Sequence, residues 1–138
     1  MIRFEDVTKT YDGQTRPALR SVTVEIAKGE FAFLVGQSGS GKSTFLRLIL
    51  REYLPTSGHI HVAGKDLSRL HSWKVPALRR QIGTVFQDFR LLPGKTVNEN
   101  VGFAMQVIGK PASLIRTVVP ETLELVGLEG KGRRMPHE

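Results

Sequence analysis

The amino-acid sequence predicts an α/β fold, in which a β-rich beginning leads into a buried strand, a glycine-rich loop and a helix. Residues 2–11 and 19–29 alternate apolar and polar side chains, which is typical of half-buried antiparallel strands. Residues 31–35 are apolar almost throughout, as is typical of a strand buried on both faces of a parallel sheet. After the loop, helical spacing is kept by the apolar residues Phe45, Leu46, Ile49 and Leu50.

The middle of the chain adds further strands to this plan. Residues 56–67 predict a turn and a short alternating strand, and residues 75–81 predict a short helix opened by Pro76. Residues 82–87, "IGTVFQ", predict a second buried strand. The sequence therefore predicts an antiparallel β-subdomain and two strands of a parallel core sheet.

Two helices are predicted in the last third of the chain, at residues 96–109 and 114–128. Their apolar faces consist of Val97, Val101, Ala104 and Met105, and of Leu114, Val118, Leu123 and Val126. Pro120 is expected to kink or restart the second helix, because proline lacks the backbone donor and crowds the preceding turn.

Bulk composition limits the class of protein. The 138 residues suit one domain with a core of its own, and no apolar run approaches the roughly 20 residues of a membrane-spanning helix. The chain has no cysteine, and its first residues lack the apolar segment of a signal peptide, so we expect a cytoplasmic protein. The net charge is +7, and part of the excess comes from the basic segment at residues 65–80. Its positive residues are interspersed with leucines, and no aromatic side chains accompany them as a stacking platform, so we expect a solvated face and no nucleic-acid partner.

The stretch "GQSGSGKST" carries the chemistry, because it fits the pattern G-x-x-x-x-G-K-[ST] between a predicted strand and a predicted helix. Backbone amides in such a loop curl round a phosphate, and Lys42 would reach the β and γ oxygens. The hydroxyl of Ser43 is the expected Mg²⁺ ligand, and the helix N-terminus favours an anion. The predicted phosphate-binding residues are Gly36, Gln37, Ser38, Gly39, Ser40, Gly41, Lys42, Ser43 and Thr44.

The whole chain resembles the ATP-binding domain of ABC transporters, which has a P-loop NTPase fold. The resemblance is carried by this loop, by Tyr11 before it and by "VFQD" after it. The resemblance implies MgATP as the ligand, with Tyr11 stacking on adenine. It also implies that Gln87, which ends "VFQ", contacts Mg²⁺ or the attacking water and so acts in catalysis together with Lys42. Ser43 and Gln87 would then be the metal ligands.

The same resemblance divides this single domain into two parts. Residues 1–87 would form the β-subdomain and P-loop core, with an incomplete parallel sheet, and residues 88–138 the Q-loop and helical subdomain. The family continues into an "LSGGQ" signature, an acidic strand and a switch histidine, none of which occurs in this sequence. Since phosphoryl transfer depends on positioning and charge, we expect an ATP hydrolase whose residues 1–138 alone bind nucleotide better than they hydrolyse it.

Within the family, "FQDFRLL" and "VVPETLELVGL" are most similar to ATP-binding subunits that act in cell division with an integral membrane partner. This implies a homodimer at the cytoplasmic face of the plasma membrane, with the partner docking near residues 87–101. Exposed apolar side chains expected there are Phe89, Leu91 and Leu92. Lipoprotein-releasing ATPases, peptide or solute transporters, and an ATP-binding docking module without turnover are the alternatives.

Two other enzyme classes fit less well. A P-loop GTPase would need a guanine-reading Asn-Lys-x-Asp, which the sequence lacks, and a nucleotide kinase normally begins with its phosphate loop. His59 and His61 share one strand face, but two ligands make no closed metal site, so we expect an ordinary strand there.

Overall fold

The computed structural model describes residues 1–138 and consists of two compact units, Met1–Gly83 and Thr84–Glu138. The division falls between Gly83 and Thr84, whereas the sequence places it after residue 87. The segment that carries Gln87 therefore belongs to the second unit.

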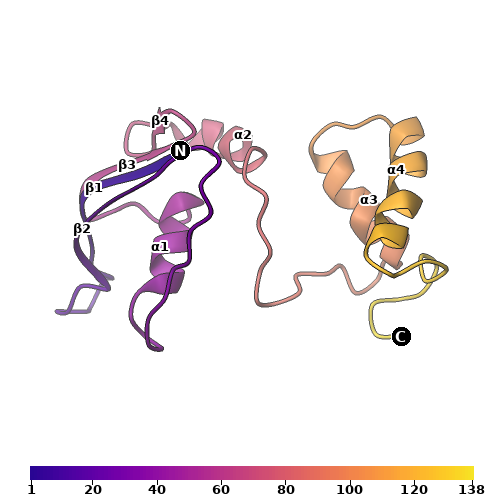
Figure 1. The fold of residues 1–138 in the computed structure, drawn as a ribbon, viewed down its shortest axis with the longest axis horizontal. Helices are drawn as coiled ribbons and strands as arrows, with labels where there is room; N and C mark the ends of the chain where they lie inside the picture. Colours follow the sequence, from indigo (N-terminus) through magenta and orange to yellow (C-terminus); the bar gives the residue numbers. More distant parts are fainter. The chain divides into compact units, whose positions relative to one another are not determined.

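The first unit contains a four-stranded antiparallel sheet of order β2-β1-β3-β4 (Figure 1). Its strands are β1 (Ile2–Lys9), β2 (Leu19–Ile26), β3 (Ser57–Val62) and β4 (Lys65–Asp66). This confirms the predicted antiparallel subdomain, including the short strand after the helix.

A bulge in β1 decides which side chains enter the core. Phe4 and Val7 are both fully buried, although strict alternation would send side chains three positions apart to opposite faces. The registers of β1 with both neighbours shift in this stretch, where Asp6 has a φ of 48°. Gly58 on β3 lies so close that a Cβ there would collide with the carbonyl oxygens of Glu5 and Asp6.

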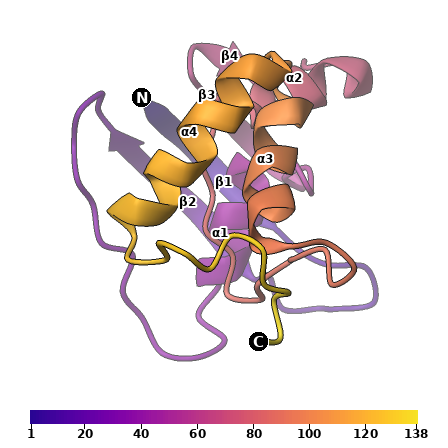
Figure 2. The same cartoon turned by 90° about the vertical axis from the view of Figure 1, so that its right-hand side faces the viewer.

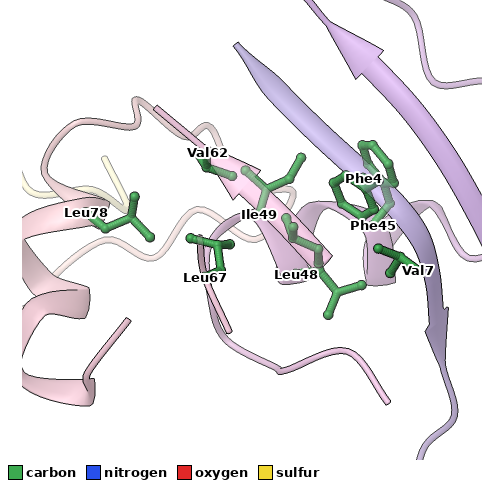
Figure 3. Close-up of a cluster of buried hydrophobic side chains, with 9 residues drawn as sticks. Phe4, Val7, Phe45, Leu48, Ile49, Val62, Leu67 and Leu78 are labelled. Atoms are coloured by element: carbon green, nitrogen blue, oxygen red, sulfur yellow. The ribbon is translucent and has the colours of Figure 1, made fainter. Parts of the chain in front are cut away.

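Helix α1 (Lys42–Ile49) packs on this sheet and forms the core of the first unit (Figure 3). The Phe45 ring stacks on Phe4, with centroids 4.3 Å apart and planes 15° from parallel. The remaining buried members of the cluster are Val7, Leu48, Ile49, Ile60, Val62, Leu67 and Leu78. The prediction of a helix is confirmed, but Leu46 does not belong to its buried face, since it is 56% exposed.

Two arginines lie at the C-terminal end of α1 and help to end the helix. Arg51 ends the helix with a φ of 55°, and the amides of Arg51 and Glu52 bond back to the carbonyls of Leu48 and Arg47. The Arg79 guanidinium donates to the carbonyl oxygens of Leu50 at 2.9 Å and Arg51 at 3.2 Å. Arg79 belongs to the basic segment at residues 65–80. This segment is therefore not only a solvated face, because the Arg79 side chain satisfies carbonyls at the end of α1.

Arg79 lies at the end of α2 (Val75–Arg79), which follows the 3₁₀ turn η1 (Ser72–Lys74) and has Pro76 in its first turn. The short helix predicted at residues 75–81 is thus confirmed.

Neither of the two predicted buried strands forms. Residues 30–37 and 82–86 have no strand structure, and the sheet contains no parallel pair. Phe31, Phe33 and Val85 are 81%, 82% and 100% exposed, so the predicted burial of these runs is also wrong. A parallel strand needs a hydrogen-bonded neighbour, and no strand of this chain pairs with either segment. Apolar composition alone does not supply that neighbour.

The second unit contains two helices that lie side by side, α3 (Val97–Val107) and α4 (Ala112–Leu125) (Figure 2). Gly102 on α3 is buried, and a Cβ there would lie 3.2 Å from Cγ2 of Ile115. Val119 and Leu123 are the buried residues of α4. The helix continues through Pro120, so the restart expected at this proline does not occur.

The predicted helical faces are only partly buried. Leu123 is buried as expected, but Leu114 and Val126 are 40% and 60% exposed, and Ala104 is also exposed. The buried contact instead uses Gly102, which a search for apolar side chains overlooks. No helix of the chain is long and apolar enough to cross a lipid bilayer.

Burial on α1 gives the first prediction. Leu48→Ala is expected to lower the free energy of unfolding by about 2–5 kcal/mol, because the fully buried side chain leaves a cavity. Leu46→Ala is the matched control on the exposed side of the same helix and should change stability by less than about 0.5 kcal/mol. Urea unfolding measures both, and equal losses would contradict the assigned buried face.

Candidate phosphate-binding site

The glycine-rich loop is wrapped around the ammonium group of Lys42. Its Nζ donates hydrogen bonds to the carbonyl oxygens of Gly36 and Gln37, both at 2.7 Å. The amide of Ser40 bonds to the Gln37 carbonyl at 3.2 Å, which closes a turn between them. The loop therefore surrounds a positive charge that belongs to the first residue of α1.

The N-terminus of α1 is left open. Its N-cap is Gly41, with no side-chain hydrogen bond to the first turn and no acidic residue in that turn. The first amides of a helix have no partners within it, and together with the helix dipole they attract an anion. The Lys42 ammonium adds a full positive charge at the same place. This end of the helix is suited to a phosphate group.

The N-terminus of α3, unlike that of α1, is capped by side chains. Thr96 accepts a hydrogen bond from the amide of Glu99, and the Glu99 carboxylate accepts one from the amide of Thr96 at 2.7 Å. The hydrogen bonds from the Thr96 backbone and hydroxyl lower the pKa of Glu99 below its usual 4.5. The first two amides of α3 donate to the backbone carbonyls of Arg134 and Gly132, both at 2.9 Å, so the positive end of this helix already has its hydrogen-bond partners.

Two glycines of the loop have close neighbours. Gly41 has a φ of 94°, and a Cβ there would collide with the carbonyl oxygen of Ala18 and lie 2.8 Å from Cδ2 of Leu19. A Cβ on Gly36 would run into the Ser40 side chain. The loop thus packs directly on the start of β2, which fixes where α1 begins.

Tyr11 lies beside this loop. Its hydroxyl is 3.0 Å from Oγ1 of Thr44, which is buried in the first turn of α1. The structure therefore brings Tyr11 and the predicted phosphate-binding loop together, although they lie far apart in the sequence. Stacking of Tyr11 on a base stays a prediction.

Sequence reasoning missed the neighbours of Tyr11. Its ring meets that of Tyr53 edge to face, with centroids 5.3 Å apart, and the Lys9 ammonium lies 5.4 Å from the Tyr11 centroid. The aromatic residue shortly after the predicted helix, in "REYLP", was the signal that could have pointed to Tyr53.

Gln87 belongs to the second unit, where it is exposed in a bend. Close by, the Arg90 guanidinium lies 3.7 Å from the centroid of the Phe86 ring and 3.1 Å from Oδ2 of Asp88. The role assigned to Gln87, and its share in binding Mg²⁺, remain predictions. Ser43 lies exposed in the first turn of α1, and its hydroxyl is the kind of oxygen donor that suits Mg²⁺.

Asn100 organises the loop that follows Gln87, and no sequence motif indicated it. Its side chain accepts from the amide of Leu92 at 2.7 Å and donates to the carbonyls of Leu92, Lys95 and Thr96. One partly buried amide group thereby holds the segment before α3 against that helix. An asparagine four residues after a helix N-cap was the available signal.

The structure contains no group of three or more His, Cys, Asp or Glu side chains that could hold a metal ion. His59 instead lies 3.7 Å from Asp66 and 3.4 Å from the Ser68 hydroxyl. The hydrogen bond from that hydroxyl lowers the pKa of Asp66 below its usual 3.8, against the opposing effect of burial. These contacts fit an ordinary strand pair.

Comparison with known proteins decides the family. The sequence profile described as "ABC transporter" matches residues 19–137, which is most of the chain and includes the phosphate loop. The chain belongs to the ABC transporter family. This confirms the resemblance and the predicted α/β fold class.

Several family members that are similar to the chain share one name. The chain is 55% identical over 138 residues to the "Cell division ATP-binding protein FtsE" of Mycobacterium tuberculosis. It is 47% identical over 138 residues to the protein of the same name from Bacillus subtilis. In both cases all of this chain is covered, and it spans 60% of the length of the relative.

Solved ABC cassettes have the same fold. A dimeric ATP-binding cassette in a post-hydrolysis state, bound to ADP and Pi, matches with a TM-score of 0.88 at 33% identity. The match covers 99% of this chain and 62% of that one. The arrangement of sheet, loop and α1 is therefore that of a cassette which holds a nucleotide in its own structure.

The contact at Gly41 gives the second prediction. Gly41→Ala is expected to lower the melting temperature of the full chain more than Gly64→Ala. Both glycines have positive φ values, 94° and 76°, so both substitutions strain the backbone by about 1–2 kcal/mol. Only the Gly41 methyl group also collides with backbone, since nothing lies within 4 Å of the Gly64 position. Equal shifts in a thermal melt would contradict the close contact with Ala18.

Proposed function

We propose that this chain is the nucleotide-binding part of an ATP-hydrolysing subunit that acts in cell division with an integral membrane partner of the FtsX type. The observation that carries the proposal is the open, uncapped N-terminus of α1 behind a loop wound round Lys42. The shared name of the similar relatives supports the link with cell division.

Phosphate binding follows from the chemistry of this loop. The bonds between Lys42 and the carbonyls of Gly36 and Gln37 are exposed, so water can replace the lysine when it turns to a phosphate. A charge-assisted hydrogen bond to a phosphate oxygen is stronger than one to a neutral carbonyl. Gly36–Thr44 would hold the phosphates, Tyr11 the adenine, and Ser43 with Gln87 the Mg²⁺ that shields phosphate charge.

Catalysis is assigned to Gln87 and Lys42 in the intact protein. Gln87 would orient the attacking water or contact the metal, and Lys42 would stabilise charge on the transferred group. The dimeric state of the solved cassettes supports a homodimer as the active form. The protein would then lie at the cytoplasmic face of the plasma membrane, where its partner anchors it.

The third prediction tests nucleotide binding. Lys42→Ala is expected to weaken binding of MgATP at least tenfold, because it removes the only full charge that the loop offers to phosphate. Lys28→Ala, which removes one equal charge from an exposed turn of the same unit, should leave the affinity unchanged. Titration with a fluorescent ATP analogue measures both variants.

An unchanged affinity in Lys42→Ala would reject the proposal. Phosphate release by the intact protein with its membrane partner separates a hydrolase from a docking module, because a docking module would bind ATP without turnover.

The proposed docking surface for the membrane partner lies near residues 87–101, which include the loop between Gln87 and α3. Phe89 is 87% exposed and Leu91 is 50% exposed, whereas Leu92 is partly buried and its backbone is bonded to Asn100. Leu91 also lines a pocket of about 390 Å³ together with Val97 and other apolar side chains. Exposed apolar side chains beside such a pocket support docking of a protein segment.

The fourth prediction tests this surface. Phe89→Asp is expected to reduce co-purification of the intact protein with its membrane partner while MgATP affinity stays unchanged. Leu125→Asp is the matched control, because Leu125 is 86% exposed in the same unit but lies at the end of α4. Equal losses of co-purification in both variants would contradict a docking surface in the loop. Loss of ATP affinity in Phe89→Asp would contradict a docking surface that is separate from the nucleotide site.

A further inference from the structure

Three side chains at the phosphate loop hold the Tyr11 side chain from several sides. We call Lys9, Tyr11, Thr44 and Tyr53 the tyrosine cluster. The Tyr11 hydroxyl is 3.0 Å from Oγ1 of Thr44, and the Tyr11 and Tyr53 rings meet at 89°. The Lys9 ammonium lies 5.4 Å from one ring centroid and 5.5 Å from the other. These contacts involve both the tip and the ring of Tyr11.

Each contact restricts a different movement of the Tyr11 ring. Thr44 is buried in the first turn of α1, so its bond ties the hydroxyl to the helix that carries the phosphate loop. The perpendicular Tyr53 ring opposes rotation of Tyr11, since edge-to-face pairs have a preferred geometry. Lys9 attracts both rings through their negative faces and so keeps them together.

This cluster is not part of the hydrophobic core. Neither tyrosine belongs to the buried cluster around Phe4 and Phe45, and Tyr53 is 37% exposed. Two large rings and a cation gathered at the surface, next to the start of α1, contribute little to burial. Their contacts instead fix the position of the Tyr11 side chain.

We propose that Tyr53 and Lys9 are positioning residues for the nucleotide base, and that they hold Tyr11 as a preformed stacking platform. The inference rests on the proposed binding of ATP and adds two residues to it. A ring fixed before binding loses less conformational freedom when a base stacks on it, which strengthens binding of the base. Tyr53 acts through Tyr11 and need not touch the nucleotide.

Two ligands separate this role from general damage to the fold. ATP carries a base, whereas inorganic tripolyphosphate carries only the phosphates that the loop recognises. In the full chain, Tyr53→Ala is expected to raise the Kd for MgATP about three- to tenfold and to leave the Kd for tripolyphosphate unchanged. Tyr53→Phe keeps the ring and should bind ATP as the unchanged protein does. Tyr53→Leu keeps apolar volume without a ring and should behave as Tyr53→Ala does.

A double-mutant comparison tests whether Tyr53 acts through Tyr11. In a Tyr11→Ala background, Tyr53→Ala and Lys9→Met should have no further effect on the Kd for ATP. The inference is overturned if Tyr53→Ala and Tyr53→Leu leave ATP affinity unchanged, if they weaken both ligands equally, or if the effect persists without Tyr11. Failure of the unsubstituted protein to bind ATP at all would reject the proposed function itself.

Discussion

The packing of α1 on the antiparallel sheet is the interaction on which the phosphate loop depends. Phe45 stacks on Phe4, and Leu48 is fully buried beside it, so the helix axis is set by the core. The loop has no such burial, because residues 36–40 are all exposed. It is positioned at one end by α1 and along its side by the contact of Gly41 with Ala18. An exposed, glycine-rich backbone can keep a defined shape only because the elements around it are rigid.

The two N-termini of α1 and α3 show how the sequence separates a structural helix end from a binding one. Both leave amides without intrahelical partners. At α3 they are satisfied by the Thr96 side chain and by the backbone carbonyls of Gly132 and Arg134, and the capping box of Thr96 and Glu99 stabilises the helix. At α1 a glycine stands at the same position, so the stabilisation of a cap is given up. That loss is offset by the buried face of α1, while the open amides remain available for an anion.

Sequence reasoning succeeded where the determining contacts are local. The antiparallel strands, the loop and the helix after it follow from alternation, glycine content and helical spacing, and the structure confirms each of them. It failed for residues 31–35 and 82–87, because strand structure depends on a neighbour that a local pattern does not specify. It also failed for Leu46, since the exact helical face depends on how α1 meets the sheet. The contact between Tyr11 and Thr44 was out of reach because it joins residues 33 positions apart.

Backbone carbonyls are the hydrogen-bond partners of several positively charged side chains of the chain. Lys42, Arg51 and Arg79 each donate to two backbone carbonyls, so part of the excess positive charge is bonded to the protein's own backbone. The bonds of Arg51 to Leu67 and Leu70 are partly buried, so those carbonyls would lose their partner if the arginine moved. The carbonyls bonded to Lys42 are exposed and can turn to water instead. Lys42 can therefore exchange neutral carbonyls for a charged phosphate at a lower cost than Arg51.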